Sequence, residues 1–237
     1  MKRRFDQLDV FSAVPLQGNP LAVVHDASGL DDERLAAFAR WTNLSETTFL
    51  LPPTDALADY RVRIFTPGGE LPFAGHPTLG SCHAWLAAGG RPRDAGMIVQ
   101  QCGVGRVRVR RSAAQGDHGA DGGQGGRLAF AAPPVRRSGP LGDALLAQIT
   151  RGLRLPADSV RAHQWVDNGP GWCAVLLDSA EAVRALQPDW PALGDLKLGV
   201  VGAQAGGSDS QFEVRALIAA GAYEDPVTGS LNASLAQ

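Results

Sequence analysis

Three ionisable side chains stand in surroundings suited to proton transfer. Glu46 lies in the segment NLSETTF, His76 lies in PFAGHPTLG, and Asp225 lies in EDPVTGS. An enzyme that moves a proton within a molecule needs one group that removes the proton from carbon and another that returns it, with both tuned by burial and neighbouring charges. The sequence therefore makes Glu46, His76 and Asp225 candidates for this kind of chemistry.

Glu46 has two interpretations from its position alone. It lies between an apolar helix pattern and an apolar strand pattern, and partial burial there would disfavour the charged form of a carboxyl group, as a general acid/base requires. In the other interpretation Asn43 caps a helix and Glu46, three residues on, completes the cap. Spacing supports both equally. His76, taken alone, is more typical of a structural histidine than of a catalytic one.

Two loop segments share one spacing. ELPFAGH begins at Glu70 and EDPVTGS begins at Glu224, so Glu, Pro and Gly recur at the same intervals. In each segment a strand pattern runs through a Gly-Pro loop into a helix pattern, which leaves backbone N–H groups free at the helix start. Gly75 and Gly229 allow a ligand to approach closely, and the helix dipole favours a carboxylate. A tight turn explains either glycine alone, but the two loops together favour a binding function.

The repetition extends beyond these loops, which indicates a duplicated chain. A Val-Arg pair precedes each copy, at residues 62–63 and 214–215, and NP before AVV at residues 19–24 resembles NGP before AVL at residues 168–176. Three correspondences at nearly the same separation predict two homologous halves, with a boundary in or near the glycine-rich stretch at residues 112–126. We expect the two loops to face one another across a cleft, where small-molecule sites concentrate.

Hydrophobic periodicity predicts the elements that position these residues. Strands are expected at residues 5–11, 21–24, 47–51, 60–65, 97–101, 104–110, 127–131, 172–177 and 211–217. Helices are expected at residues 35–41, 79–88 and 141–151. The segment 67–77 is expected to be a Gly-Pro-rich loop. The stretch 112–126 is expected to be a flexible hairpin tip, in which His118 is a solvated residue rather than a metal ligand.

Composition excludes several functional classes. With 44% hydrophobic and 19% charged residues the chain is typical of a globular protein with a core. A net charge of −2 predicts no nucleic-acid partner. The absence of a long apolar run or an apolar signal core predicts a cytoplasmic protein without a membrane partner. The widely spaced Cys82, Cys102 and Cys173 are expected to be reduced thiols, mostly buried, and not a metal site. Without a G-x-G-x-x-G or P-loop motif, no cofactor is expected.

The motifs as a set resemble the PhzF-like family of phenazine biosynthesis. They are NPLAVV at residues 19–24, LSETTF at 44–49, PFAGHPTLG at 72–80 and EDPVTGS at 224–230. The resemblance covers nearly the whole chain. It implies a diaminopimelate epimerase-like fold, which is an α+β protein of two pseudo-symmetric halves, each a curved, mostly antiparallel sheet around a central helix. Here the halves would be residues 1–115 and 116–237, and the protein would be a homodimer.

The resemblance also implies a function. It implies a cofactor-independent isomerase that acts on a small amino- or hydroxy-carboxylate by a 1,3-type proton shift or by an epimerisation. In the best-known member the substrate is trans-2,3-dihydro-3-hydroxyanthranilate. In that assignment Glu46 is the general acid/base, and His76 and Asp225 hold the substrate and assist proton transfer. The groups implied to hydrogen-bond the substrate carboxylate are Gly75, Gly229 and Ser230.

The chain departs from its wider fold relatives in ways that bear on activity. Epimerases and racemases of this fold use a pair of cysteines, one in each loop, where this chain has His76 and Ser230, so a two-thiol racemase is disfavoured. The segment 215–223 lacks the aromatic-proline pattern of residues 65–67, and family members continue for another strand or two beyond residue 237. The alternative from another class is a catalytically silent ligand-binding or scaffold protein that retains the pocket.

Overall fold

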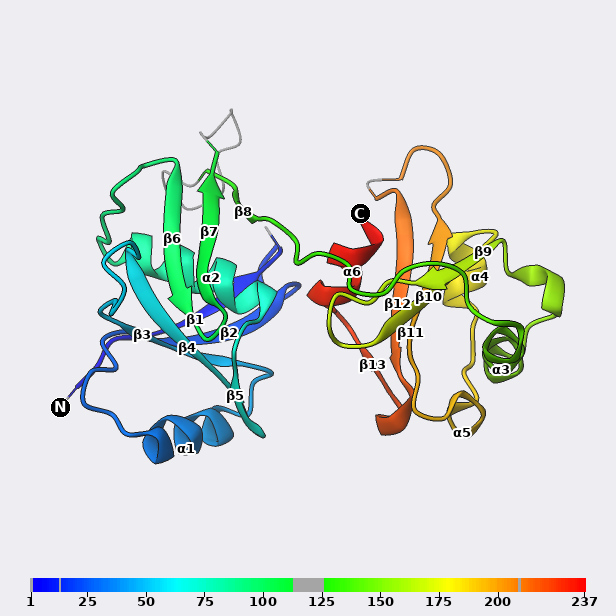
Figure 1. The fold of residues 1–237 in the computed structure, drawn as a ribbon, viewed down its shortest axis with the longest axis horizontal. Helices are drawn as coiled ribbons and strands as arrows, with labels where there is room; N and C mark the ends of the chain where they lie inside the picture. Colours follow the sequence, from blue (N-terminus) through cyan, green and yellow to red (C-terminus); the bar gives the residue numbers. More distant parts are fainter. Residues whose placement is uncertain (1, 13, 113–125, 209) are drawn as a thin grey trace. The chain divides into compact units, whose positions relative to one another are not determined.

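The chain divides into two compact units, Met1–Ala131 and Ala132–Gln237. The structure is a computed structural model that describes residues 2–12, 14–112, 126–208 and 210–237 (Figure 1). Most of the predicted hairpin tip, including His118, lies outside these residues. Each unit is an α+β body with its own sheet and its own core, as the resemblance implied.

Unit 1 contains one eight-stranded sheet. Its strands are β1 (Phe5–Val10), β2 (Asn19–Val24), β3 (Thr47–Leu51), β4 (Tyr60–Thr66), β5 (Gly69–Leu71), β6 (Met97–Cys102), β7 (Gly105–Arg111) and β8 (Leu128–Phe130). They follow the order β1-β2-β3-β4-β6-β7-β8, and β5 forms a hairpin with β4. The β2–β3 and β4–β6 pairs are parallel and the other pairs are antiparallel.

The sheet of unit 1 curves around helix α2 (Gly75–Ala87), because strands from both of its ends, β1 and β8, contact this one helix. Strand β4 shows how alternation builds the two faces. Tyr60, Val62 and Ile64 pack in the core that includes α2, whereas Phe65 packs on the other face with helix α1 (Asp32–Thr42). The central helix thus carries His76 on a buried, rigid support.

Unit 2 contains a five-stranded sheet in the order β13-β12-β11-β10-β9. Its strands are β9 (Ala162–Trp165), β10 (Trp172–Leu177), β11 (Lys197–Ala203), β12 (Phe212–Ile218) and β13 (Tyr223–Asp225). Its helices are α3 (Asp143–Leu153), α4 (Ala180–Arg184), α5 (Trp190–Leu193) and α6 (Gly229–Leu235), with short 3₁₀ turns η1 (Ala157–Ser159) and η2 (Ala219–Gly221). The β10–β11 pair is parallel and the remaining pairs are antiparallel.

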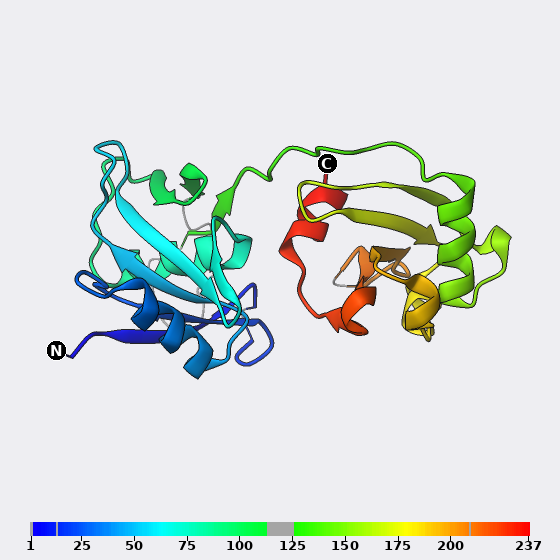
Figure 2. The same cartoon turned by 60° about the horizontal axis from the view of Figure 1, so that its bottom comes forward.

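Both faces of the unit 2 sheet are covered, which explains the unbroken apolar run WCAVLL in β10. Trp172 and Ala174 pack with Leu231 of α6. Cys173 and Val175, which point to the opposite face, pack in the core that contains residues of α3, α4 and α5. Figures 1 and 2 show α6 and α3 on opposite sides of these strands.

The predicted elements are found, with two kinds of correction. The segment 67–77 is not only a loop, because it contains β5 and the start of α2, which begins at Gly75 instead of Leu79. Proline is tolerated in the first turn of a helix, so Pro77 did not mark a loop. Pattern reading also missed β9, β11, β13, α4 and α5. Strand β11 was missed since its sequence, KLGVVGA, contains glycines that lower strand propensity.

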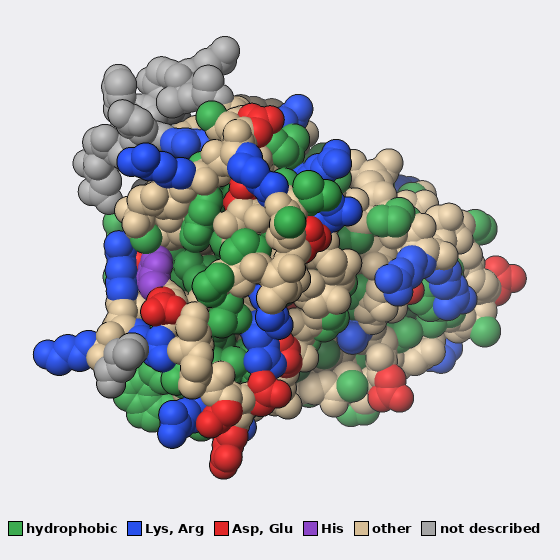
Figure 3. Space-filling view, turned by 60° about the vertical axis from the view of Figure 1, so that its left-hand side comes forward, with side chains coloured by type: hydrophobic (Ala, Val, Ile, Leu, Met, Phe, Trp, Pro, Cys, Tyr) green, Lys and Arg blue, Asp and Glu red, His purple; other side chains and the backbone are tan. Residues whose placement is uncertain are grey.

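No helix among the described residues is long and apolar enough to cross a membrane. On the face shown in Figure 3, Lys and Arg side chains are interspersed with Asp and Glu side chains and with apolar ones. This face therefore carries no extended patch of a single charge, in line with the small net charge of the chain.

Candidate active site

Glu46 lies in the short connection between α1 and β3. Asn43 is the C-cap of α1, with a left-handed φ of 54°, and its backbone N–H donates to the carbonyl oxygen of Ala39 at 3.2 Å. Strand β3 begins at Thr47, so Asn43 ends a helix and does not start one. The interpretation of Glu46 as part of a helix cap is therefore wrong. The Glu46 side chain is 16% exposed.

The structure brings Glu46 and His76 together within unit 1. His76 is the second residue of α2, its side chain is 9% exposed, and its Nε2 lies 3.4 Å from Oε2 of Glu46. On the other side of the ring, Nδ2 of Asn19 lies 3.0 Å from Nδ1 of His76. The Phe11 ring lies beside the imidazole, with 6.3 Å between ring centroids. A carboxyl group and an imidazole, both largely shielded from water, thus face each other as a candidate acid–base pair.

The sequence patterns place Asn19 in the internal repeat and in the motif NPLAVV, but they assign no role to its side chain. It is the first residue of β2, directly before Pro20, and its partner His76 is 57 residues away in the chain. The signal that points to it is the repetition of the asparagine before a proline at Asn168.

A buried chain of hydrogen bonds fixes the start of α2 to the sheet. The Tyr60 hydroxyl donates to Oε1 of Gln100 at 2.7 Å, and Nε2 of Gln100 donates to Oγ1 of Thr78 at 3.0 Å. Thr78 in turn donates to the carbonyl oxygen of Ala74 at 2.9 Å, just before Gly75. Burial raises the pKa of Tyr60 well above its ordinary value, so the hydroxyl stays a donor.

The two loop glycines differ in their surroundings. A Cβ atom at Gly75 would lie 3.3 Å from the Phe130 ring, so the absence of a side chain there serves packing. A Cβ atom at Gly229 would meet nothing within 4 Å, and Gly229 is exposed. The backbone at Gly229 is therefore exposed, and its binding role stays a prediction.

In unit 2, Asp225 and Ser230 flank one loop. Asp225 is the last residue of β13, and its Oδ1 accepts from the backbone N–H groups of Val227 at 3.1 Å and Thr228 at 3.2 Å. These bonds hold the loop that leads into α6, where Ser230 is the second residue. Ser230 in α6 takes the position that His76 takes in α2.

Ser230 is held by two side chains from the region of β10. The indole Nε1 of Trp172 donates to the Ser230 hydroxyl oxygen at 2.9 Å. Nδ2 of Asn168 donates to the Ser230 carbonyl oxygen at 3.0 Å. Trp172 was not singled out in the sequence, because a tryptophan in an apolar strand indicates core packing first.

The repeated glutamates brace hairpins. Glu70 in β5 accepts from Nε and Nη2 of Arg63 in β4, at 2.7 and 2.6 Å. Glu224 in β13 accepts in the same bidentate way from Arg215 in β12, with Nε at 2.9 Å. The carboxylate of Glu70 raises the pKa of Arg63. The glutamate of each copy therefore holds the strand pair that precedes the loop.

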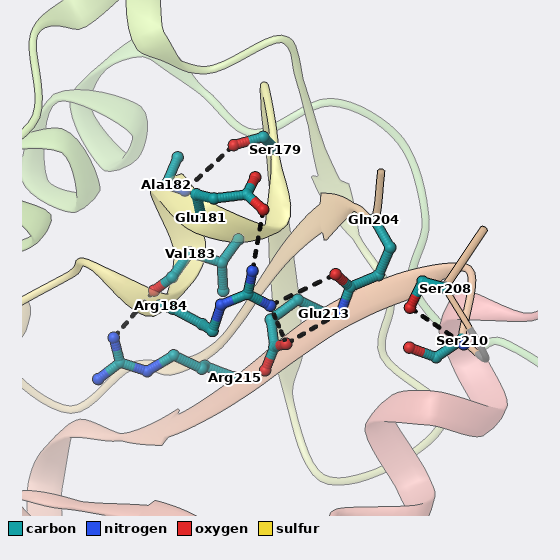
Figure 4. A network of polar contacts seen from close by, with 10 residues as sticks. All are labelled: Ser179, Glu181, Ala182, Val183, Arg184, Gln204, Ser208, Ser210, Glu213 and Arg215. Atoms are coloured by element: carbon teal, nitrogen blue, oxygen red, sulfur yellow. Dashed lines mark hydrogen bonds and ion pairs between the residues drawn. The ribbon is translucent and has the colours of Figure 1, made fainter. Parts of the chain in front are cut away.

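Each bracing arginine also links its hairpin to a helix. Nη1 of Arg63 donates to Oδ1 of Asp32, in the first turn of α1, at 2.6 Å. Nη1 of Arg215 donates to the carbonyl oxygens of Val183 at 3.0 Å and Leu186 at 2.8 Å, at the end of α4. Figure 4 shows this bond to Val183 beside a neighbouring network of Arg184 with Glu181, Glu213 and Gln204.

The cysteines lie outside both loops. Cys82 is in α2, Cys102 ends β6 and Cys173 is in β10, and all are free thiols, of which Cys82 and Cys173 are buried. Burial raises the pKa of Cys82 to about 12 and of Cys173 to about 11. The prediction that the thiols are mostly buried is confirmed, and the raised pKa values make Cys82 and Cys173 poor nucleophiles near neutral pH.

Fold and site together define a class. The chain is a duplicated α+β protein in which a braced hairpin, a Gly-Pro loop and a helix occur twice, and in which the first copy presents a glutamate paired with a histidine.

Comparison with known proteins places this class within one family. The family model of the phenazine biosynthesis-like protein, PhzC-PhzF, matches residues 8–237. The trans-2,3-dihydro-3-hydroxyanthranilate isomerase of Pseudomonas aeruginosa is 35% identical over 233 residues, which cover 98% of this chain and 78% of that protein. Antisense-enhancing sequence 1 of Schizosaccharomyces pombe is 36% identical over 195 residues, which cover 81% of this chain and 63% of that protein. The chain belongs to the phenazine biosynthesis-like (PhzC-PhzF) family.

Solved structures agree on the fold. The crystal structure of a PhzF-family phenazine biosynthesis protein from Bacillus anthracis has a TM-score of 0.77 at 20% identity and covers 100% of this chain and 79% of that one. A predicted epimerase from Pseudomonas aeruginosa has a TM-score of 0.69 at 27% identity, covering 99% and 81%. The chain thus spans only part of the length of these relatives.

Proposed function

We propose that this protein is a cofactor-independent isomerase that shifts a proton between two carbons of a small amino- or hydroxy-carboxylate. The observation that carries the proposal is the Glu46–His76 pair, with Nε2 of His76 at 3.4 Å from Oε2 of Glu46 and both side chains largely shielded from water. A carboxyl group in such a setting exchanges protons with a carbon acid more readily than a solvated one.

In the proposed reaction Glu46 acts as both base and acid. Its carboxylate takes a proton from one carbon of the substrate, and the electron pair of the broken C–H bond moves into the neighbouring double bond. Glu46 then returns the proton to a second carbon, which restores the ionised carboxylate. Atoms and electrons balance without an oxidant or a reductant. His76 faces Glu46 and stabilises the ionised carboxylate before the first step and after the second.

The remaining residues are proposed to bind the substrate. Oδ1 of Asp225 is engaged by backbone N–H groups of its own loop, which leaves Oδ2 to accept from an amino or hydroxyl group of the substrate. Substrate-binding roles are assigned to the backbone N–H group of Gly75 in unit 1 and, in unit 2, to the backbone N–H group of Gly229 and the hydroxyl of Ser230. The isomerase named among the relatives, at 35% identity, supports a dihydro-hydroxyanthranilate-like substrate.

The proposal is tested by turnover. The purified chain is incubated with trans-2,3-dihydro-3-hydroxyanthranilate and with a panel of amino and hydroxy carboxylates, and products are separated by chromatography. Calorimetry measures binding in parallel. We expect one of these compounds to be isomerised by the wild type, and Glu46→Gln to bind it but lose about 10²- to 10⁴-fold in turnover. Binding without turnover in the wild type would instead indicate a silent ligand-binding protein.

A further inference from the structure

Asn19 contacts the imidazole of His76 on the edge opposite Glu46. Nδ2 of Asn19 lies 3.0 Å from Nδ1 of His76, while Nε2 of the same ring faces the Glu46 carboxyl group. Asn19 is held in place at the start of β2, where it pairs with Val10 of β1. The ring of His76 is therefore contacted at both nitrogens by side chains of different chemistry.

The two contacts determine where the histidine proton lies. A neutral imidazole has one N–H donor and one acceptor nitrogen, and an ionised carboxylate only accepts. Two acceptors facing each other would repel, so the nitrogen toward Glu46, Nε2, carries the hydrogen. Nδ1 is then an acceptor, and the amide N–H of Asn19 is the matching donor. A second proton on Nδ1 would meet this N–H group and is disfavoured.

We propose that Asn19 is a positioning residue that keeps His76 neutral and in the Nε2–H tautomer, so that this N–H points at Glu46. The proposal deepens the proposed function and depends on it for the roles of His76 and Glu46. Its chemical consequence is that His76 supplies a hydrogen bond without transferring a whole proton to Glu46. An ionised Glu46 that faces this N–H group remains able to take a proton from carbon.

The second unit offers a matched control. Asn168 lies two residues before Pro170, in the segment that corresponds to Asn19-Pro20. Its Nδ2 donates to the carbonyl oxygen of Ser230, the second residue of α6. The same residue type thus ties the start of a loop helix in each unit. In unit 1 it meets a titratable ring, whereas in unit 2 it meets a backbone carbonyl group.

The test is ¹⁵N NMR of the full chain with labelled histidine, in mildly alkaline buffer where free histidine is neutral. The chain has five histidines, and the His76 signals are those lost in His76→Gln. We expect the wild type to show protonated Nε2 and unprotonated Nδ1. In Asn19→Asp the donor becomes an acceptor, so Nδ1 of His76 should gain a proton. Asn168→Asp should leave the His76 signals unchanged.

Two results would overturn the role of Asn19: a wild-type His76 protonated at Nδ1, or an Asn19→Asp variant with unchanged His76 signals. The wild-type spectrum decides by itself if the variant does not fold. In turnover, we expect Asn19→Asp to lower kcat by on the order of tenfold or more with a smaller change in KM. Because the tautomer is measured without substrate, an inactive protein with the expected tautomer would contradict the proposed function and not this inference.

An independent observation concerns Ser230. An indole N–H can only donate, so the Ser230 oxygen, at 2.9 Å from Nε1 of Trp172, must be the acceptor in that bond. The hydroxyl hydrogen of Ser230 is then directed away from Trp172. Trp172 is 2% exposed and lies in β10, so the position of its indole N–H group is fixed by the surrounding core. We infer that Trp172 is a positioning residue that turns the Ser230 hydroxyl into a donor for the substrate carboxylate.

A double-mutant cycle tests this role. Trp172→Phe keeps an aromatic ring and removes the donor, and we expect it to raise KM by about three- to tenfold, the effect of about one neutral hydrogen bond, with little change in kcat. In a Ser230→Ala background the same substitution should have no further effect on KM. Trp190→Phe, in α5, is the control and should leave KM unchanged. An equal rise in KM with and without Ser230 would show that Trp172 acts only through packing.

Discussion

Gln100 is a fully buried polar side chain whose partners explain its presence. It accepts a hydrogen bond from Tyr60 and donates one to Thr78, and both of those residues are also buried. A buried polar group contributes to stability only while its partners remain. The chain of bonds from β4 through β6 to the first turn of α2 therefore depends on this one amide.

Replacing Gln100 with Leu takes away the hydrogen-bond partner of both Tyr60 and Thr78. The Tyr60 hydroxyl loses its acceptor in the core, and we expect a loss of about 1–3 kcal/mol in the free energy of unfolding. Urea unfolding followed by circular dichroism measures it. A Tyr60→Phe, Gln100→Leu double variant should recover part of the loss, since the orphaned hydroxyl is gone. Wild-type stability in Gln100→Leu would contradict the role assigned to the amide.

Residues of the candidate site differ in how far sequence reveals them. Glu46 and His76 stand out because their motifs combine ionisable groups with helix and loop signals. Asn19 and Trp172 do not, because their roles arise from hydrogen bonds to residues 57 and 58 positions away. Such contacts depend on how strands and loop helices pack, which local patterns do not report.

Helix α2 approaches the sheet at a glycine. A Cβ atom at Gly80 would lie 2.5 Å from Cδ2 of Leu21 and 2.9 Å from Cγ2 of Val10, and both of these residues are buried. Core side chains that are packed on all sides cannot move away cheaply. The close contact between α2 and strands β1 and β2 thus requires a residue without a side chain at this position.

Gly80→Ala tests this contact between elements. Overpacking costs about 1–3 kcal/mol, while alanine returns about 1 kcal/mol of helix propensity, so we expect a net destabilisation on the order of 1 kcal/mol. Thermal and urea unfolding measure it. Gly68→Ala is the control, because its nearest neighbour would be Oγ1 of Thr66 at 3.6 Å, an ordinary contact. A more stable Gly80→Ala variant would show that the helix has room to shift.

Elements with a clean pattern were predictable and those whose pattern is broken were not. The strand predicted at residues 172–177 is β10 to the residue. Strand β11 went unpredicted since Gly199 and Gly202 interrupt it. A side chain does not fit at either glycine: a Cβ atom at Gly199 would lie 2.7 Å from Cδ1 of Leu231, and one at Gly202 would lie 2.2 Å from the carbonyl oxygen of Ser179. Tertiary packing requires glycine at these two positions, although glycine has a low propensity for strands.

The stability of the whole molecule is expected to fall in alkaline solution. Burial raises the pKa of Cys82 from 9.0 to about 12 and that of Cys173 from 9.0 to about 11, and it raises the pKa of Tyr60 as well. The folded chain therefore keeps protons that the unfolded chain releases. This contribution to stability is fully present below pH 9.0 and is lost as the pH rises towards 12.

Urea midpoints measured across this alkaline range test the expectation. We predict a decline above the ordinary thiol pKa, with a shallower slope in a Cys82→Ala, Cys173→Ala variant, which has fewer buried groups to titrate. Iodoacetamide labelling supplies a second readout, because at the same pH Cys82 should react about 10³-fold more slowly in the folded chain than in urea. Rapid labelling of the folded protein would contradict the burial of these thiols.

At the scale of the whole molecule, the duplication was predictable because Glu, Pro and Gly recur at one spacing. The structure adds that the repeated glutamates brace hairpins, with Phe65 opposite Glu70 in one unit and Leu217 opposite Glu224 in the other. The second hairpin is longer, since the turn η2 lies between its strands. An insertion in a turn leaves the register of the flanking strands unchanged, which is why the repeat survives in both sequence and structure.

Carbon-acid chemistry at Glu46 is the central claim, and solvent-deuterium incorporation tests it most directly. The protein is incubated in D₂O with dihydro-hydroxyanthranilate and the panel of amino and hydroxy carboxylates, and NMR follows each carbon-bound hydrogen. We predict that deuterium appears at one carbon of one substrate with the wild type and that Glu46→Gln abolishes the exchange. Exchange that persists in a folded Glu46→Gln variant, or its absence from the folded wild type with every compound, would contradict the claim.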